Sequence, residues 1–237
     1  MSRVFFSLMQ KSIEWISNIF FSGTFVFMFH QVNDNKKEWK DSNLSITKAS
    51  FNEFIRKLLQ NGYKFYSLEQ LTECKEKKAI VLTFDDIYAD VVENAIPYLV
   101  ERRIPFSIFV SERFIDREGY ISRKQLNMLR NEPLCTIGYH GKRHSLMRNL
   151  SSAQARDEVE CSELESILHQ SMRFFAFPYG SMYACNWRSV QVVKKANYKF
   201  AFSTISAPCN SLWINFFGYF LPRININEHN YQRFLRR

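Results

Sequence analysis

Strand-like and helix-like segments alternate regularly from about residue 44 onward, and this alternation constrains the fold more than any other feature. Residues 79–84 form an unbroken run of strand-forming apolar residues, which predicts a strand buried on both faces. The other predicted strands cover residues 105–110, a stretch that ends at residue 137, residues 173–177 and residues 199–203. Because helical segments separate these strands, the pattern favours a parallel sheet covered by helices, either open or closed into a barrel.

Helix-start signals support the same alternation. A Ser followed three residues later by Glu or Gln predicts a capping box, and such pairs stand at positions 50/53, 67/70, 122/125 and 151/154. We therefore expect a helix from Ser50 to Gly62, a short one after Ser67, and others near 90–103, from Ser122, from Ser151 to about His169, and near 187–196. No internal repeat or low-complexity linker interrupts the pattern, so we expect a single domain.

Charge and cysteine content narrow the classes of partner and compartment. The chain has 32 Lys and Arg against 23 Asp and Glu, a net charge of +9, but the basic residues are scattered and no recognition motif accompanies them. We expect no nucleic-acid binding, and an anionic membrane surface, an acidic ligand or a plainly solvated face stay open. The five cysteines are an odd, widely spaced set without a CxxC pair. They predict neither a disulfide framework nor a cysteine zinc site, and they favour a reducing compartment.

Residues 1–23 precede the alternating region and form a segment of their own. The stretch is rich in Phe and Ile, but polar residues interrupt it and no small-residue cleavage site follows, so it fits neither a signal peptide nor a spanning helix. Two interpretations stay open: an amphipathic helix that lies on a membrane, or a helix packed on the domain. The apolar residues that could line such a helix are Val4, Leu8, Ile13, Ile16, Phe20 and Phe21.

Polar residues cluster at three of the predicted strand ends, where the active site of such a fold gathers. Asp85 and Asp86 end the strand that starts at residue 79, and a helix cap explains one of the two carboxylates but not easily both. His140 and His144 follow the strand that ends near residue 137, and their spacing would place both imidazoles on one face of a helical turn. The third cluster, at 175–180, is either an ordinary turn with an aromatic plug or a fixed loop that directs an amide N–H toward the site.

A pair of histidines at this spacing is a weak signal by itself, but a strand-end carboxylate strengthens it. One Asp with two His supplies three ligands to a divalent ion and leaves positions open for water and substrate. A buried carboxylate also needs something positive to face it. The sequence therefore predicts a metal site at the carboxyl edge of the sheet.

With these clusters in view, the sequence resembles the polysaccharide deacetylase family, also called the NodB homology domain or carbohydrate esterase family 4, over roughly residues 24–227. The sequence TFDD at 83–86 resembles the first family motif, 140–144 the second (HSxxH or HTxxH) and FPYG at 177–180 the third. Residues 28–32 resemble the YHxV strand of the exopolysaccharide-type branch. The motifs stand in the family order.

The resemblance implies a distorted (β/α) barrel over residues 24–237, with 1–23 as an N-terminal helix, and a divalent metal, usually Zn²⁺, with Co²⁺, Ni²⁺ or Mn²⁺ as alternatives. It implies that Asp86, His140 and His144 are the metal ligands and that Asp85 is the general base. The backbone N–H of Tyr179, together with the metal, would hold the oxyanion that forms during acyl transfer.

Four departures from the family pattern stand out. Ile87 replaces the usual Gly after the Asp pair, so we expect the loop there to avoid positive φ. Gly141 replaces the Ser or Thr between the histidines and removes a hydroxyl that often supports the ligands. Ala176 stands where many members have an Arg that orients the base. The late Leu-His motif that supplies the general acid is not evident, and residues 221–225 near its place offer Arg223 instead.

The general acid must therefore be sought among the other histidines. Two of the five histidines are assigned to the metal, which leaves His30, His169 and His229. His169 ends a polar helix and His229 lies in a polar tail, whereas His30 ends an apolar strand and could point into the mouth of the site. We hypothesise that His30 acts as the acid or orients the substrate.

The sequence thus predicts a metal-dependent hydrolase that removes an acetyl group from an acetylamino sugar in a surface polysaccharide, lipopolysaccharide or glycolipid pathway. Because no secretion signal is evident, we expect a cytoplasmic protein, peripheral at the inner membrane face, with a carbohydrate substrate that could be lipid-linked. Two alternatives stay open. One is a degenerate member that binds a glycan or partner without catalysis, and the other is an amidase of the same fold that acts on a non-sugar amide.

Overall fold

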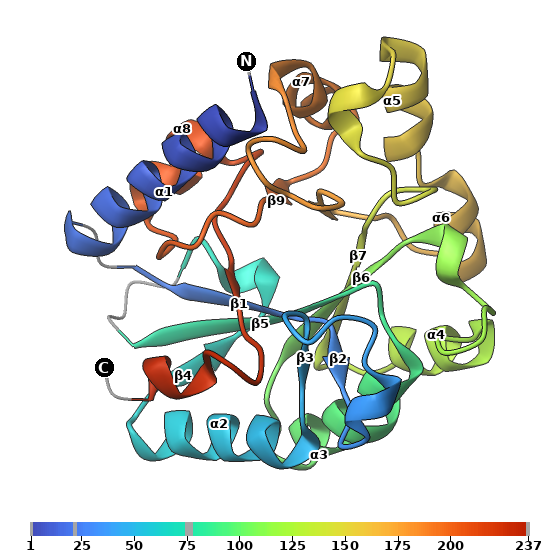
Figure 1. Ribbon diagram of the computed structural model, residues 1–237. Coiled ribbons are helices and arrows are strands. Elements are labelled where there is room, and N and C mark those ends of the chain that lie inside the picture. The colour runs from blue at the N-terminus through green and yellow to red at the C-terminus, as the bar shows by residue number, and fades with distance from the viewer. Residues whose placement is uncertain (1, 21–22, 74–77, 236–237) are drawn as a thin grey trace.

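A parallel sheet curls around the centre of the molecule, and helices cover its outside (Figure 1). The computed structural model describes residues 2–20, 23–73 and 78–235. The strands follow the order β10-β1-β5-β6-β7-β8-β9, and β4 also pairs with β5. Their bounds are β1 (Phe25–Phe29), β4 (Lys64–Tyr66), β5 (Ala79–Asp85), β6 (Phe106–Val110), β7 (Cys135–Tyr139), β8 (Phe174–Ala176), β9 (Phe200–Phe202) and β10 (Ile224–Asn225). The short strands β2 (Gln31–Val32) and β3 (Ser45–Ile46) pair with each other.

The five strands predicted from the sequence are present as β5, β6, β7, β8 and β9, each within two residues of the predicted bounds. The segment 221–225 then closes the sheet. Leu221 bridges to Phe202 of β9, and Ile224 and Asn225 pair with β1. The expected distorted (β/α) barrel is thereby confirmed.

Side chains of β5 alternate between the inside and the outside of this barrel. Val81 belongs to the inner apolar cluster, whereas Ile80, Leu82 and Phe84 belong to the cluster under the helices. Because side chains alternate with a period of two, Asp85 continues the inward face of Val81. The inner cluster comprises Val26, Val81, Phe109, Phe174, Ala176, Phe200, Phe202, Cys209 and Leu221, with Leu68 and Leu71 beside it. Polar side chains at the carboxyl ends of the strands thus meet above an apolar floor.

The predicted helices are present, with two corrections, and α8 is a further helix that the sequence did not predict. Their bounds are α1 (Arg3–Phe20), α2 (Lys48–Gln60), α3 (Ile96–Glu101), α4 (Arg123–Arg130), α5 (Ser152–Val159), α6 (Ser162–Leu168), α7 (Trp187–Lys195) and α8 (Ser211–Phe217). The first correction concerns α2, which begins after Thr47 and not at Ser50, because the Thr47 side chain accepts the Ser50 amide at 3.1 Å. Ser50 is buried inside the helix and donates to Glu228.

The second correction concerns the single long helix expected from Ser151 to His169, which is two helices, α5 and α6. Two tyrosine hydroxyls bind the backbone carbonyls at the break: Tyr198 donates to Val159 at 2.7 Å and Tyr139 donates to Glu160 at 2.9 Å. A carbonyl turned toward a side chain in this way is drawn out of the helical ladder, so the helix ends there.

Helix α1 packs on the domain beside α8 (Figure 1). The amide of Met182 donates to Gln10 at 3.0 Å, and the amide of Ser206 donates to Glu14 at 2.9 Å. The opposite side of α1 stays exposed, including Val4 and Leu8. Of the other residues that the sequence placed on this helix, Phe21 lies outside the described residues, and only the backbone of Phe20 is described. Among the described residues, we find no helix with the length and apolar character that a membrane crossing requires.

Candidate metal centre

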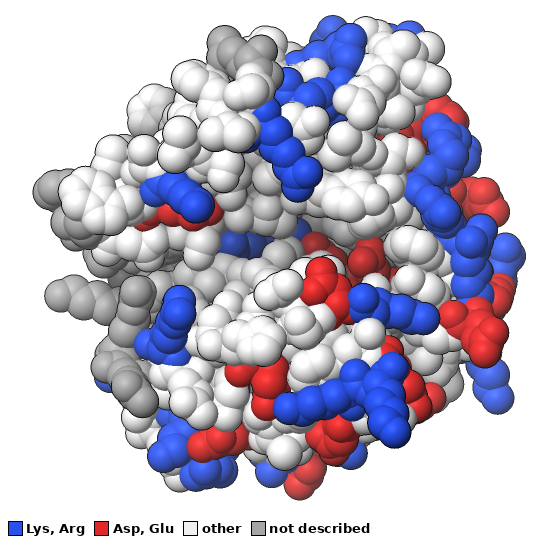
Figure 2. All heavy atoms as spheres, viewed as in Figure 1, with Lys and Arg blue, Asp and Glu red and all other residues white. Residues whose placement is uncertain are grey.

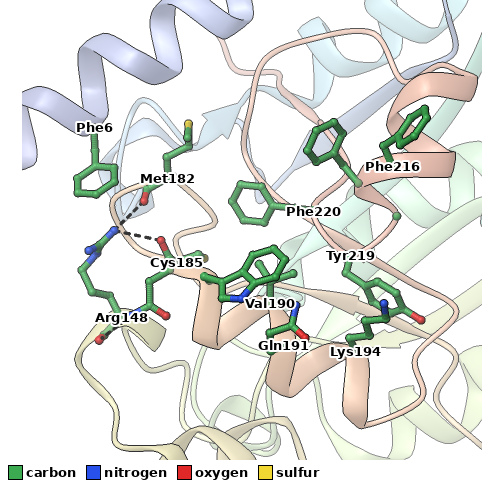
Figure 3. Close-up of a pocket in the computed structure, with 14 residues that line it drawn as sticks. Phe6, Arg148, Met182, Cys185, Val190, Gln191, Lys194, Phe216, Tyr219 and Phe220 are labelled. Atoms are coloured by element: carbon green, nitrogen blue, oxygen red, sulfur yellow. Dashed lines mark hydrogen bonds between the residues drawn. The ribbon is translucent and has the colours of Figure 1, made fainter.

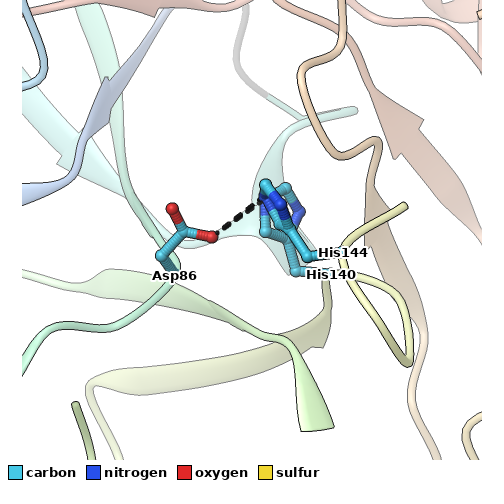
Figure 4. A group of neighbouring side chains, drawn as sticks. All are labelled: Asp86, His140 and His144. Carbon is cyan, nitrogen blue, oxygen red and sulfur yellow. Dashed lines mark ion pairs between the residues drawn. The ribbon is translucent and has the colours of Figure 1, made fainter. Parts of the chain in front are cut away.

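The side chains of Asp86, His140 and His144 lie close together above the barrel floor (Figure 4). Asp86 follows β5, and both histidines follow β7. The Oδ1 atom of Asp86 is 3.1 Å from Nε2 of His144 and 3.6 Å from Nε2 of His140. The three ligand atoms all lie within 4.8 Å of one another. One carboxylate and two imidazoles are a common ligand set for zinc and related divalent ions.

The chemistry of these donors fits a metal ion. Nδ1 of His140 lies 2.8 Å from the carbonyl oxygen of Ala176, and because that oxygen can only accept, Nδ1 carries the proton. Nε2 of His140 therefore turns a lone pair toward Asp86, whose buried Oδ1 has no hydrogen-bond partner among the described residues. Two acceptors that face each other in a buried site repel unless a cation lies between them.

Burial and charge set the ionisation of these groups. Burial alone would raise the pKa of Asp85 and of Asp86. The charge of Arg223 outweighs burial at Asp85, and the imidazoles of His144 and His140 outweigh it at Asp86, so both pKa values lie below the ordinary value. Burial lowers the pKa of His140 to about 4. An ionised carboxylate and a neutral imidazole are the forms that bind a metal.

The loop that carries His140 and His144 is not the helical turn that the sequence predicts. Residues 140–146 lack helical structure, and two of them adopt positive φ, Gly141 at 83° and His144 at 55°. The two imidazoles still converge, with ring centroids 5.0 Å apart. The amides of this loop bind the buried carboxylate of Glu158 instead of the carbonyls of a helix, which is why the helical conformation is not adopted.

Ile87 also corrects an expectation, because it adopts the positive φ that its replacement of Gly was expected to prevent. Its φ is 43°, and Asp86 before it has a φ of 61°. Such strain costs about 1–3 kcal/mol in a residue with a Cβ. The Ile87 side chain is completely buried in the outer apolar cluster, and burial of an aliphatic side chain contributes about 1.5–3 kcal/mol. Packing of Ile87 therefore offsets the strain.

Arg223 is the buried cation that faces Asp85. Its Nη1 and Nη2 atoms donate to the two carboxylate oxygens at 2.6 and 2.7 Å, and Nε donates to the carbonyl of Ser203 at 3.1 Å. The Arg223 side chain is completely buried. From the sequence alone, Arg223 was noted only near the place of the missing late motif, without a role. A signal for its role was present, since a buried strand-end carboxylate requires a positive partner and residue 176, where many relatives carry an Arg, is Ala.

Of the remaining histidines, the structure brings only His30 to the site. His30 is 8% exposed, and its Nδ1 has no hydrogen-bond partner among the described residues. Charges of Asp85, Asp86, Arg223 and His144 all act on it. His169 and His229 are exposed.

Tyr179 stands at the rim of the site. Its ring packs against His144 with centroids 4.9 Å apart and is 58% exposed. Its φ of 61° is positive, so the loop turns sharply at this residue. In Figure 2 the surface is hollowed near its middle, and atoms of acidic and basic side chains lie inside the hollow.

Comparison with known proteins identifies the family and the fold. The family model for polysaccharide deacetylase matches residues 72–201. The poly-β-1,6-N-acetyl-D-glucosamine N-deacetylase of Staphylococcus aureus is 26% identical over 237 residues, an alignment that covers 92% of this chain and 78% of that protein.

Two solved structures share the fold. Streptococcus pyogenes deacetylase PplD, solved in complex with acetate, has a TM-score of 0.78 at 21% identity, covering 90% of this chain and 96% of that one. IcaB from Ammonifex degensii has a TM-score of 0.71 at 21% identity, covering 91% of this chain and 97% of that one. At this identity the likeness establishes the architecture, and the chemistry has to be argued from the side chains.

Proposed function

Because this chain belongs to the polysaccharide deacetylase family, we propose that it is a metal-dependent hydrolase that removes the N-acetyl group of an acetylamino sugar in a surface polysaccharide, lipopolysaccharide or glycolipid. One observation carries the metal dependence. The buried Oδ1 of Asp86 faces the unprotonated Nε2 of His140, and His144 approaches the same oxygen. The name of the staphylococcal relative supports an N-acetyl sugar as the substrate class.

In this proposal Asp86, His140 and His144 hold the ion and Asp85 moves the proton. A divalent ion bound there would polarise the acetyl carbonyl and lower the pKa of the attacking water. Asp85 is ionised and lies 3.9 Å from Nε2 of His140, close to the ligands. It takes the proton of the water as the water attacks the carbonyl carbon. The two bonds from Arg223 fix the plane of the Asp85 carboxylate.

Tyr179 and His30 complete the proposed machinery. The backbone N–H of Tyr179 donates to the carbonyl oxygen of the acetyl group as negative charge develops on it. His30 lies on the other side of the Asp pair at the end of β1, with an unpaired ring nitrogen to offer. We assign to it the orientation of the sugar or the protonation of the leaving amine. If His30→Ala keeps near-normal turnover with its metal bound, this assignment is wrong.

The decisive experiment measures acetate release from a panel of lipid-linked, nucleotide-linked and oligomeric N-acetylhexosamines. We expect release that stops on chelation, returns with Zn²⁺ or Co²⁺, and is abolished in Asp85→Asn, which keeps the shape of the side chain and loses the base. Metal should also raise stability, by about 2.7 kcal/mol at a hundredfold excess over its Kd. The Asp86→Asn variant should lose both the metal-dependent acetate release and the stabilisation by added metal.

Two rivals give different outcomes in the same experiment. A degenerate member that only binds a glycan would release no acetate from any substrate, even after zinc or cobalt is added. An amidase of the same fold would bind the metal but act on a non-sugar amide and leave the sugar panel intact. Asp85, the three candidate ligands and the Arg223 pair are all present, which favours catalysis.

We further propose that the protein lies peripherally on the anionic inner face of a membrane. Exposed apolar side chains stand on three helices: Val4, Leu8 and Trp15 on α1, Trp187 on α7, and Phe216 and Phe217 on α8. On the outer side of α1, Val4 and Leu8 lie beside Lys11. Exposed apolar side chains next to a cation are typical of a helix that lies on an anionic membrane surface.

A hollow of about 420 Å³ opens where residues of α1, α7 and α8 meet (Figure 3). The rings of Phe6, Phe216 and Phe220 surround it, and Arg148 and Lys194 stand at opposite sides. Helices α7 and α8 contain no acidic residue, and Glu14 of α1 is bonded to the amide of Ser206. The excess of basic over acidic groups favours an anionic partner, and each Lys or Arg near an anionic bilayer contributes about 1 kcal/mol.

Vesicle sedimentation tests this position. We expect binding to vesicles that contain phosphatidylglycerol and weaker binding to phosphatidylcholine alone. The double substitution Leu8→Ser with Trp15→Ser should release the protein, as should Lys11→Glu with Lys194→Glu. Met128→Ser on α4, far from α1 in Figure 1, removes an equally exposed apolar side chain and should change nothing. The absence of anionic binding, or a dimer dissociated by the same substitutions, would contradict the proposal.

A further inference from the structure

The carboxylate of Glu158 lies completely buried beneath the loop that carries His140 and His144. Oε1 accepts the amides of Arg143 at 3.1 Å and Ser145 at 2.9 Å, and Oε2 accepts the Ser145 hydroxyl at 3.0 Å. The backbone carbonyl of Glu158 accepts the amide of Lys142 at 3.0 Å. Glu158 of α5 therefore binds the amides of three residues, 142, 143 and 145, in a loop that has no helix or strand of its own.

These contacts bracket His144. Arg143 and Ser145 are its two neighbours in sequence, and His144 between them adopts a φ of 55°. A non-glycine residue holds such a conformation only when its surroundings enforce it. Neighbouring amides that converge on one anionic oxygen form a concave anion site, which fixes the backbone on both sides of the strained residue. The backbone conformation decides where the imidazole of His144 points.

Gly141 shows that the loop is shaped around this carboxylate. A Cβ at position 141 would lie 2.6 Å from Oε1 of Glu158, closer than such atoms approach, and its φ of 83° disfavours a side chain as well. The hydroxyl that relatives carry between the two histidines has no room here. Ser145 supplies a hydroxyl from the other side of His144 instead.

Helix stability does not explain the position of Glu158. Helix α5 ends at Val159, so the charge lies in the last turn, where the helix dipole disfavours an acidic side chain. Its neighbour Asp157 is exposed and forms surface ion pairs with Lys142 and Arg143. Of these two adjacent carboxylates, only Glu158 reaches the amides around His144.

We infer that Glu158 is a positioning residue that holds His144 in its ligand geometry, and thereby sets the affinity of the site for its metal. This inference rests on the proposed metal site. Outer partners of metal ligands typically account for 10- to 100-fold in metal affinity. Glu158 acts one step further out, through the backbone of the ligand and not through its ring.

The test is the Zn²⁺ dissociation constant of the folded protein, measured by competition with a chelator, for Glu158→Ala, Glu158→Gln and the matched control Asp157→Asn. Thermal unfolding of each metal-free variant is recorded in parallel. We expect Glu158→Ala to weaken Zn²⁺ binding by about 10- to 100-fold. Glu158→Gln keeps one acceptor oxygen for the two amides, so its loss should be smaller. Asp157→Asn should bind as the wild type does.

A merely structural role would lower the unfolding temperature and leave the dissociation constant of the folded protein unchanged. That result in Glu158→Ala and Glu158→Gln overturns the inference while the proposed metal site stands. If Glu158→Ala does not fold, Glu158→Gln decides by the same criterion. A wild-type protein that binds no Zn²⁺ overturns the metal site, and this inference with it.

Discussion

Asp85 and Arg223 form a buried ion pair in which each partner depends on the other. Removal of one partner from such a pair typically costs about 3–5 kcal/mol, because the remaining charge is left without water and without a counter-ion. Burial raises the pKa of Asp85, and Arg223, with a smaller contribution from His140, outweighs burial and lowers it. The pair therefore serves two purposes: it keeps the base ionised, and it holds both carboxylate oxygens in a fixed plane.

This dependence gives a pH prediction for Arg223→Gln, made for the metal-free protein. In the wild type the folded pKa of Asp85 is below its unfolded value of about 3.9, so the pair contributes stability above that pH and loses it as pH falls through the folded pKa. In the variant, burial dominates and raises the folded pKa, so ionisation at neutral pH destabilises the fold. Urea unfolding should show a difference of about 3–5 kcal/mol at neutral pH that shrinks as pH falls toward about 4.

Arg223→Lys is the matched control, because it keeps the charge and loses the two-pronged contact. Its stability should lie between those of the wild type and Arg223→Gln. A loss in Arg223→Gln that is the same at neutral and acidic pH would show that the pair contributes packing and not charge.

The roles of site residues that directly follow a recognisable strand could be predicted from the sequence, whereas the roles of Arg223 and Glu158 could not. Asp86, His140 and His144 could be proposed as a group because each follows a recognisable strand of one parallel sheet. Arg223 could not be assigned to Asp85, because the partners are 138 residues apart and nothing local in 221–225 indicates where the segment packs. The sequence placed Glu158 in a charged helix, and its role was missed because nothing in that pattern shows that its carboxylate turns inward to the amides of Arg143 and Ser145.

At the scale of elements, α1 is joined to the loop that carries Tyr179. Gln10 accepts the amide of Met182 and also contacts the carbonyl of Thr204, so one side chain of α1 holds two loops at the rim of the site. Periodicity predicted the helix and its two candidate surfaces. It could not predict this polar anchor, because Gln10 read as an interruption of the apolar pattern.

Gln10→Ala should loosen the 179–183 loop without unfolding the barrel. A single neutral hydrogen bond contributes about 0.5–1.5 kcal/mol, so amide exchange in peptides around Met182 should accelerate by roughly 2- to 10-fold in hydrogen–deuterium exchange. Asn18→Ala, which removes a contact of the same helix with the carbonyl of Ser206, is the control. Asn18→Ala should leave amide exchange in the Met182 peptide unchanged. Equal acceleration in both variants would mean that the loop responds to any weakening of the packing of α1 and not to Gln10 in particular.

The division between α5 and α6 marks another limit of sequence reasoning. The charged pattern from 151 to 169 has helical periodicity throughout, and no Gly or Pro interrupts it. The break comes from Tyr139 and Tyr198, two residues of other segments, which bind carbonyls at its centre. Local sequence signals predict where a helix begins, but they do not predict a break that contacts with distant residues cause.

At the scale of the whole molecule, the barrel is completed by one short segment that pairs first with β9 and then with β1. Leu221 is completely buried in the inner cluster, and Arg223 enters the site two residues later. Leu221→Ala should lower the free energy of unfolding by about 2–5 kcal/mol. It should also lower acetate release, because the position of Arg223 depends on this packing.

Leu126→Ala on α4 provides the comparison, since Leu126 is equally buried in the outer cluster and remote from the closing segment. It should cost similar stability in urea unfolding, with acetate release per folded molecule unchanged. If acetate release falls equally in both variants, the packing of Leu221 has no specific effect on the reaction, and the prediction is wrong.

The late position of the closing segment has a consequence for the protein as it is synthesised. Asp85 emerges from the ribosome 138 residues before Arg223. At roughly 5–20 residues per second, the carboxylate therefore waits on the order of ten seconds for its counter-ion. During that wait the nascent chain must keep β5 hydrated at its carboxyl end, since an unpaired charge resists burial. The interior of the barrel is thus sealed only after residue 223 has been made and its guanidinium can neutralise the carboxylate.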